Sequence, residues 1–153
     1  MSTQILDKLY LWFFILHIPA TIFVDLGQFL PRSVLPGWVF IPLDFYVSTF
    51  DDPLFTRDRG GWLLSFFFLE IVIQLPVFVY GIQSLKKAGI GLSRQSMLVL
   101  LVYAVQSTTT TFGCVAELLA FEASATVIVG FYMPFLFATL VMAVDMFQRL
   151  NGK

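Results

Sequence analysis

Four long apolar runs dominate this chain and restrict what it can fold into. They cover residues 9–30, 62–83, 95–118 and 123–147, and each is long enough for a helix that crosses a bilayer, which needs roughly 20 apolar residues. Hydrophobic residues make up 58% of the chain and charged residues only 12%, about half the charged fraction of a soluble domain. We therefore predict an all-α integral membrane protein, a four-helix bundle that forms one domain over residues 1–153.

The connection between the first two runs differs from the other loops. It covers roughly residues 31–61, contains four prolines, and mixes aromatic side chains with acidic ones. Aromatic residues gather at the level of the lipid headgroups. We expect this segment to form a cap at the membrane surface that covers a cavity, although an ordinary ordered loop would have the same composition.

Basic residues predict the orientation of the bundle. One side of the predicted membrane carries Lys8, Lys86, Lys87, Arg94, Arg149 and Lys153, whereas Arg32, Arg57 and Arg59 lie on the other side among acids. Because cytoplasmic loops carry an excess of Lys and Arg, both termini are expected in the cytoplasm and the long connection in the lumen or outside. The segment before the first run lacks the basic start of a cleaved signal, so we expect this run to stay as a membrane helix.

Charge and cysteine content limit the partners. The net charge is −1 with no basic tract, so we expect no nucleic-acid partner. A single cysteine, Cys114, allows no disulfide within the chain and no cysteine-based metal cluster, and its apolar surroundings are typical of a small core residue. We predict no metal and no cofactor.

Two acids, Asp25 and Glu70, lie inside the first and second apolar runs. A carboxyl group at membrane depth is costly, about 2.5–3.5 kcal/mol on insertion scales, and usually faces protein or a cavity. The two runs are antiparallel and place both acids at similar depth. Two carboxyls that face each other share one proton, and the remaining charge would bind a cation. A purely structural hydrogen-bonded pair is the alternative.

Other polar residues share helix faces with these acids. His17 and Thr21 precede Asp25 at steps of four residues, and Gln74 lies one turn after Glu70. The third run carries a polar stripe composed of Tyr103, Gln106, Ser107, Thr110, Cys114 and Glu117. The predicted ligand-binding residues are Asp25, Glu70, His17, Thr21, Gln74, Phe66, Phe67, Thr110 and Tyr132. Interhelical hydrogen bonding is the alternative role for His17, Gln74 and the threonines.

Two prolines and one further acid have predicted structural roles. Pro19 and Pro76 each remove a backbone donor, and kinks there would widen the bundle near the acids, unless they produce only harmless bends. Asp52 precedes Pro53 in the long connection, where an aspartate caps a turn more often than it contacts a ligand.

Several strings, in this order and spacing, resemble one family. They are His17-Ile18-Pro19 and Phe23-Val24-Asp25-Leu26, then Asp52-Pro53-Leu54, then the segment from Glu70 to Pro76, and finally Tyr132-Met133-Pro134. Together they resemble the sigma-2 receptor (transmembrane protein 97) family of the EXPERA domain. That wider group also contains emopamil-binding protein, a sterol isomerase, and fungal relatives linked to quality control of mitochondrial precursors.

The resemblance implies a four-helix protein of the endoplasmic reticulum that binds sterols and cationic amphiphiles and serves sterol homeostasis or trafficking. It also implies a homodimer, a state this family often forms. In the family, the acid matching Asp25 pairs with the protonated amine of a ligand, the acid matching Glu70 hydrogen-bonds to it, and the acid matching Asp52 supports the luminal loop.

The isomerase and the quality-control factor remain alternative functions. The isomerase resembles this chain at His17 and Glu70, but it carries a glutamate where this chain has Thr21. Moving a double bond needs one group that adds a proton and another that removes one. The missing glutamate therefore favours a binding protein over an enzyme.

Overall fold

The structure is a computed structural model that describes residues 3–57, 61–87 and 91–152. Two basic residues of the orientation argument, Arg59 and Lys153, lie outside these ranges. Four helical segments are long and apolar enough to cross a membrane: Thr3–Phe29, Gly61–Lys86, Arg94–Ala120 and Ala125–Leu150. The predicted fold class, an all-α membrane bundle of four spans with a cap after the first, is confirmed.

Three of the four spans are interrupted by a widened π-helical turn. The first span is α1 (Thr3–Ala20) followed by a π turn (Thr21–Asp25) and a 3-10 turn (Gly27–Phe29). The second is α4 (Gly61–Leu69), a π turn (Glu70–Gln74) and α5 (Leu75–Lys86). The third is the uninterrupted helix α6 (Arg94–Ala120), and the fourth is α7 (Ala125–Val127), a π turn (Ile128–Tyr132) and α8 (Met133–Leu150).

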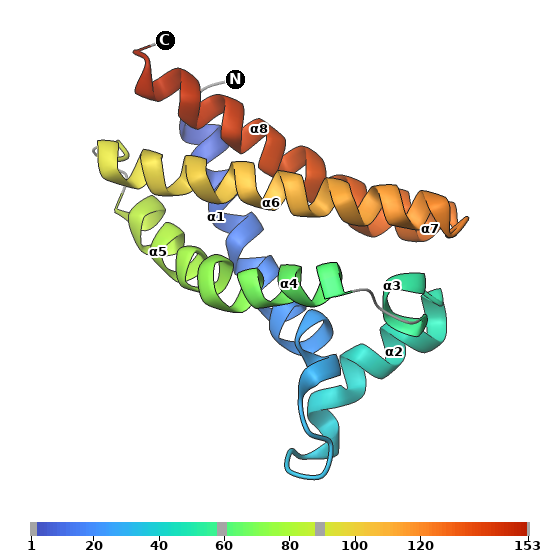
Figure 1. The fold of residues 1–153 in the computed structure, drawn as a ribbon. Coiled ribbons are helices and arrows are strands. Elements are labelled where there is room, and N and C mark those ends of the chain that lie inside the picture. Colours follow the sequence, from blue (N-terminus) through green and yellow to red (C-terminus); the bar gives the residue numbers. More distant parts are fainter. Residues whose placement is uncertain (1–2, 58–60, 88–90, 153) are drawn as a thin grey trace.

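The cap between the first two spans is also helical. It contains a 3-10 turn (Gly37–Phe40), α2 (Ile41–Phe50) and the short helix α3 (Pro53–Thr56). Figure 1 shows both chain ends at one end of the bundle and α2 and α3 towards the opposite end. α6 and α8 run side by side and form the most extensive helix pair, while α1 packs against α5.

The first span begins at Thr3, earlier than the apolar run that starts at residue 9. The added turn carries Asp7, whose carboxylate accepts a hydrogen bond from Arg149 Nη1 at 2.7 Å. Arg149 also pairs with Asp145 at 2.7 Å, and Asp145 accepts a bond from the Tyr10 hydroxyl at 3.1 Å. Because Arg149 pairs with both acids, the helix can extend past the apolar run, and this network ties the first span to the fourth.

Two apolar clusters hold the bundle together. The larger one joins α1, α5, α6 and α8 at the end near the termini, and its buried members are Tyr10, Phe14, Phe78, Leu85, Leu100, Tyr103, Ala104, Met142 and Met146. The smaller one joins α3, α4, α6 and α7 at the cap end through Leu54, Leu63, Phe67, Leu118 and Val127. Between the two clusters the spans are held apart.

Gly81 allows the closest approach in the larger cluster. A Cβ at this position would lie 2.7 Å from Cε2 of Phe14 and 3.3 Å from a methyl group of Leu100. Both of these side chains are fully buried, so neither can move away without disturbing its neighbours. Glycine therefore lets α5 pack directly on the Phe14 ring.

We expect Gly81→Ala to lower the free energy of unfolding by about 1–3 kcal/mol, because the added methyl group overpacks the core. Gly130→Ala is the matched control, since a Cβ there meets nothing within 4 Å. The Tm of each purified variant in detergent measures the effect. A Tm for Gly81→Ala equal to that of Gly130→Ala would contradict the packing described here.

Candidate functional site

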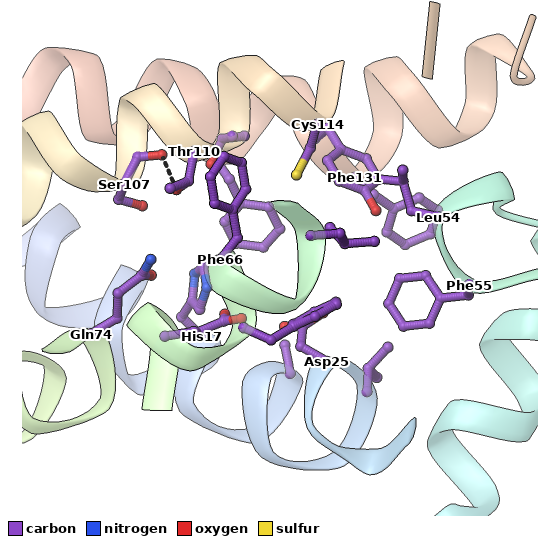
Figure 2. A pocket seen from close by; sticks show the side chains of 18 of the residues that line it. His17, Asp25, Leu54, Phe55, Phe66, Gln74, Ser107, Thr110, Cys114 and Phe131 are labelled. Atoms are coloured by element: carbon purple, nitrogen blue, oxygen red, sulfur yellow. Dashed lines mark hydrogen bonds between the residues drawn. The ribbon is translucent and has the colours of Figure 1, made fainter. Parts of the chain in front are cut away.

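A cavity of about 260 Å³ lies between the two apolar clusters. All four spans and the cap contribute to its wall (Figure 2). The lining residues are His17, Ala20, Val24, Asp25, Tyr46, Leu54, Phe55, Leu63, Phe66, Phe67, Glu70, Gln74, Ser107, Thr110, Thr111, Cys114, Phe131, Tyr132 and Phe135. Aromatic and aliphatic side chains make up most of this wall, and a few polar groups interrupt it. That is the usual composition of a site for a small apolar molecule with a polar group.

Both intramembrane acids line this one cavity. Asp25 belongs to the π turn of the first span and Glu70 begins the π turn of the second. Thr21 lies behind them, fully buried, and its hydroxyl donates to Oε1 of Glu70 at 3.1 Å. The threonine thus satisfies one carboxyl oxygen of Glu70, while Asp25 faces the same space from the first span.

His17 lies in the cavity wall inside a cage of aromatic rings. Its ring centroid is 5.1 Å from that of Phe13, 5.0 Å from Phe78 and 4.5 Å from Phe135. Its Nδ1 atom has no hydrogen-bond partner among the described residues. Gln74, which is also buried, lines the same region from the second span. These two side chains place polar atoms in an otherwise apolar part of the wall.

The polar stripe of the third span is only partly directed at the cavity. Ser107, Thr110 and Cys114 line it from α6, and the Thr110 hydroxyl donates to the Ser107 carbonyl oxygen at 3.1 Å (Figure 2). Gln106 is not in the wall, and neither polar atom of its amide has a partner among the described residues. Cys114 packs against the smaller apolar cluster, as the sequence predicted, and it also borders the cavity.

The three π turns supply much of the wall. Asp25, Glu70 and Tyr132 each lie within one of them, and each turn has a proline close by. Pro76 and Pro134 follow their π turns by two residues, and Pro19 precedes its turn by two. Proline cannot donate the usual backbone bond, and a π turn adds a residue to the helix. The sequence predicted kinks at Pro19 and Pro76, and the structure has widened turns beside both.

Asp52 joins the cap to the fourth span. It is fully buried, and its Oδ2 accepts from the hydroxyls of Tyr46 at 2.6 Å and Tyr132 at 2.8 Å. Its Oδ1 accepts from the backbone N–H of Leu54 at 2.9 Å and so caps α3. Burial and the Asp52 carboxylate raise the pKa of Tyr46, which keeps the phenol protonated as a donor. Asp51 ends α2 and changes the chain direction just before Asp52. Its φ of 46° lies in the left-handed region, which aspartate tolerates.

The structure therefore gathers the predicted ligand-binding residues around one cavity, with Thr21 behind the wall rather than in it. The remaining lining residues were not predicted as ligand contacts. Three of them, Tyr46, Leu54 and Phe55, belong to the cap, and two, Phe131 and Phe135, belong to the fourth span. Prolines near the acids gave a signal for the widened turns, but nothing in the spacing of these apolar residues distinguishes cavity from core.

The fold and this cavity define a class: four-span membrane proteins with an acid-lined cavity inside the bundle. Residues 38–146 match the family model described as EXPERA (EXPanded EBP superfamily). The chain belongs to this family.

Curated relatives agree with that assignment. The chain is 34% identical over 151 residues to efficient mitochondria targeting-associated protein 19 of Schizosaccharomyces pombe, covering 95% of this chain and 76% of the relative. It is 35% identical over 98 residues to human sigma intracellular receptor 2, covering 64% of this chain and 53% of that protein. A similar protein of Saccharomyces cerevisiae, also named for efficient mitochondria targeting, is 38% identical over 48% of this chain and 45% of its own length. The resemblance to the sigma-2 receptor family and its fungal relatives is confirmed.

We expect Asp52→Ala to destabilise the protein more than Tyr46→Phe or Tyr132→Phe. The alanine variant removes the acceptor of two half-buried phenols and of the Leu54 N–H, and hydrogen bonds to charged groups contribute about 1.5–3 kcal/mol each. Asp44→Ala is the control, because Asp44 lies in the same cap but in an exposed ion pair with Arg32, which stabilises little. Thermal unfolding in detergent measures all four variants, and equal Tm values for Asp52→Ala and Asp44→Ala would contradict the role of Asp52.

Proposed function

We propose that this protein binds a sterol-like or cationic amphiphilic molecule within the membrane of the endoplasmic reticulum, without catalysing a reaction on it. One observation carries the proposal: two acids at membrane depth, Asp25 and Glu70, face a single, mostly apolar cavity. A protonated amine would pair with these acids, and the aromatic wall would hold the apolar body. The name of the sigma intracellular receptor relatives supports a ligand-binding role.

The cavity size limits how such a ligand fits. Its volume of about 260 Å³ lies just below the roughly 300–1,000 Å³ of typical small-molecule pockets. A small amine would fit as the cavity stands, whereas a ring system as large as a sterol would extend between the spans towards lipid. We propose that the ligand enters from the bilayer by this lateral route, with both termini of the protein in the cytoplasm.

The acids make a direct prediction for binding. Asp25→Asn should weaken the binding of a radiolabelled cationic amphiphile by roughly 30-fold or more, because losing one member of a desolvated charge pair costs about 2–5 kcal/mol. Glu70→Gln should also weaken binding, and nanodiscs that carry the double variant should bind no more ligand than empty nanodiscs do. Filtration binding to purified protein in lipid nanodiscs measures each affinity.

Two controls make this experiment decisive. Asp44→Asn changes an exposed carboxylate to an amide outside the cavity and should leave the affinity unchanged. A neutral analogue, in which carbon replaces the amine nitrogen, should bind wild type and Asp25→Asn equally. Equal affinity of the cationic amphiphile for wild type and Asp25→Asn would refute charge pairing. If the wild-type protein shifts a ring double bond of an unsaturated sterol and Glu70→Gln does not, the protein is instead an isomerase.

A second candidate function is a role in directing proteins to mitochondria. It is favoured by the S. pombe relative, which is named for efficient mitochondria targeting and matches 95% of this chain. The two functions are distinguished in fission yeast cells that lack that relative. If Asp25→Asn with Glu70→Gln restores mitochondrial import as well as wild type does, targeting does not need the cavity and acts through other surfaces.

A further inference from the structure

The cap exposes an apolar face that the bundle does not cover. Trp38, Ile41 and Phe45 follow one another at steps of three and four residues along the 3-10 turn and α2, so they share one side of a continuous helical segment. Their exposed fractions are 63%, 64% and 62%. We call these three residues the outer face of α2.

The opposite side of α2 already packs against protein. Phe40 and Leu43 are buried there, and the Tyr46 and Phe50 rings pack against Phe131 of the fourth span, with centroids 5.2 and 4.6 Å from it. The inner side of α2 is therefore covered by protein, whereas its outer side is amphipathic. Exposed polar residues lie there among the exposed apolar ones: Asp44, Ser48 and Thr49. Large apolar side chains exposed beside polar ones are typical of a helix at a membrane interface.

The cap follows the first membrane span closely along the chain. The first span ends at Phe29, itself an exposed aromatic at the cap end, a few residues before the cap helices begin. α2 runs across the direction of α6 and α8 rather than along it (Figure 1). A helix that crosses the direction of the spans at their ends lies near the plane of the membrane surface, where amphipathic and aromatic segments bind.

The charges of the segment fit the same placement. Arg32 and Asp44 form an exposed ion pair with each other at the edge of the outer face, since Asp44 directly precedes Phe45. The guanidinium carbon of Arg32 lies 4.7 Å from the ring centroid of Phe40. The hydrogen bond between the two side chains raises the pKa of Arg32 and lowers the pKa of Asp44, so both groups stay charged. An ion pair at the edge of the outer face can lie in the polar headgroup layer. Tryptophan is enriched at the boundary between the headgroups and the acyl chains, just below that layer.

We propose that α2 is an interfacial anchor: its outer face lies in the headgroup–acyl boundary of the leaflet on the cap side, with Trp38, Ile41 and Phe45 inserted among the lipids. Since Tyr46 on the inner side lines the cavity and bonds to Asp52, the anchor holds the cap between the cavity and the membrane surface. The proposal rests on the exposed face of α2 alone and does not depend on what the cavity binds.

Fluorescence of a single tryptophan tests the anchor. Trp12→Phe with Trp62→Phe leaves Trp38 as the only tryptophan of the full chain. The purified protein is reconstituted into phosphatidylcholine vesicles whose acyl chains are brominated near the headgroup, or into unbrominated vesicles with iodide in the water. We expect the shallow bromines to remove most of the Trp38 emission and iodide to remove little of it.

A matched reporter gives the control. Adding Trp38→Phe and Asp44→Trp to the Trp12→Phe, Trp62→Phe protein moves the single tryptophan to position 44, at the edge of the outer face. Iodide should quench the tryptophan there more than it quenches Trp38. Far-UV circular dichroism checks that both reporters keep the helix content of wild type. Strong iodide quenching of Trp38 with no bromine quenching would place the outer face in water and overturn the proposal. Quenching by neither would show that protein covers it, a second copy or a partner, and would overturn it as well.

Discussion

Hydrocarbon offers no hydrogen bonds, and the placement of the acids in the four spans follows from that constraint. Asp25, Glu70 and Thr21 satisfy one another or face the cavity, because lipid would leave them without partners. For the same reason, Asp7 and Asp145 pair with Arg149 at the other end of the bundle. The two polar groupings differ in one respect. The ion-pair network contains its own cation, Arg149, whereas the acids at the cavity have no lysine or arginine among its lining residues.

The open space beside Asp25 and Glu70 depends on the backbone as much as on the side chains. Three spans carry π turns at the cavity, and the uninterrupted α6 closes it on the remaining side. An added residue in a helix turn widens the helix locally and changes the direction in which the following side chains point. Such turns recur at functional sites. In the second and fourth spans a proline helps to explain the turn, because Pro76 and Pro134 cannot donate to the carbonyl four residues earlier, which lies inside the π turn. Widened turns keep the two apolar clusters from merging, and the cavity fills the space between them.

The cap completes the enclosure through one buried carboxylate. Asp52 accepts from Tyr46 in α2 and from Tyr132 in the fourth span, so a single side chain ties the cap to the bundle. Both tyrosine rings also line the cavity, which means that the contact holding the cap shapes the wall of the site. Changes to the cap and changes to the cavity are therefore physically linked.

Hydropathy was sufficient to predict the four spans, because a bilayer allows few alternatives to a helix of the right length. It also located Asp25 and Glu70, since an acid in an apolar run stands out in any sequence. The start of the first helix was missed because its charge at Asp7 is neutralised by Arg149, which is 142 residues away. The aromatic cage of His17 was missed for a similar reason. Apolar residues that line a cavity and those that fill a core follow the same periodicity, and only the packing of distant spans separates them.

Cys114 offers the most direct measurement of the central claim, because the only thiol of the chain borders the cavity that the two acids share. Its reaction with a small apolar thiol reagent is followed by mass spectrometry with and without a tertiary-amine amphiphile. The account predicts that the amine slows labelling of the wild-type thiol and does not slow it when Asp25→Asn and Glu70→Gln are combined. Equal protection in both proteins, or protection of wild type by the neutral carbon analogue to the same extent, would contradict it.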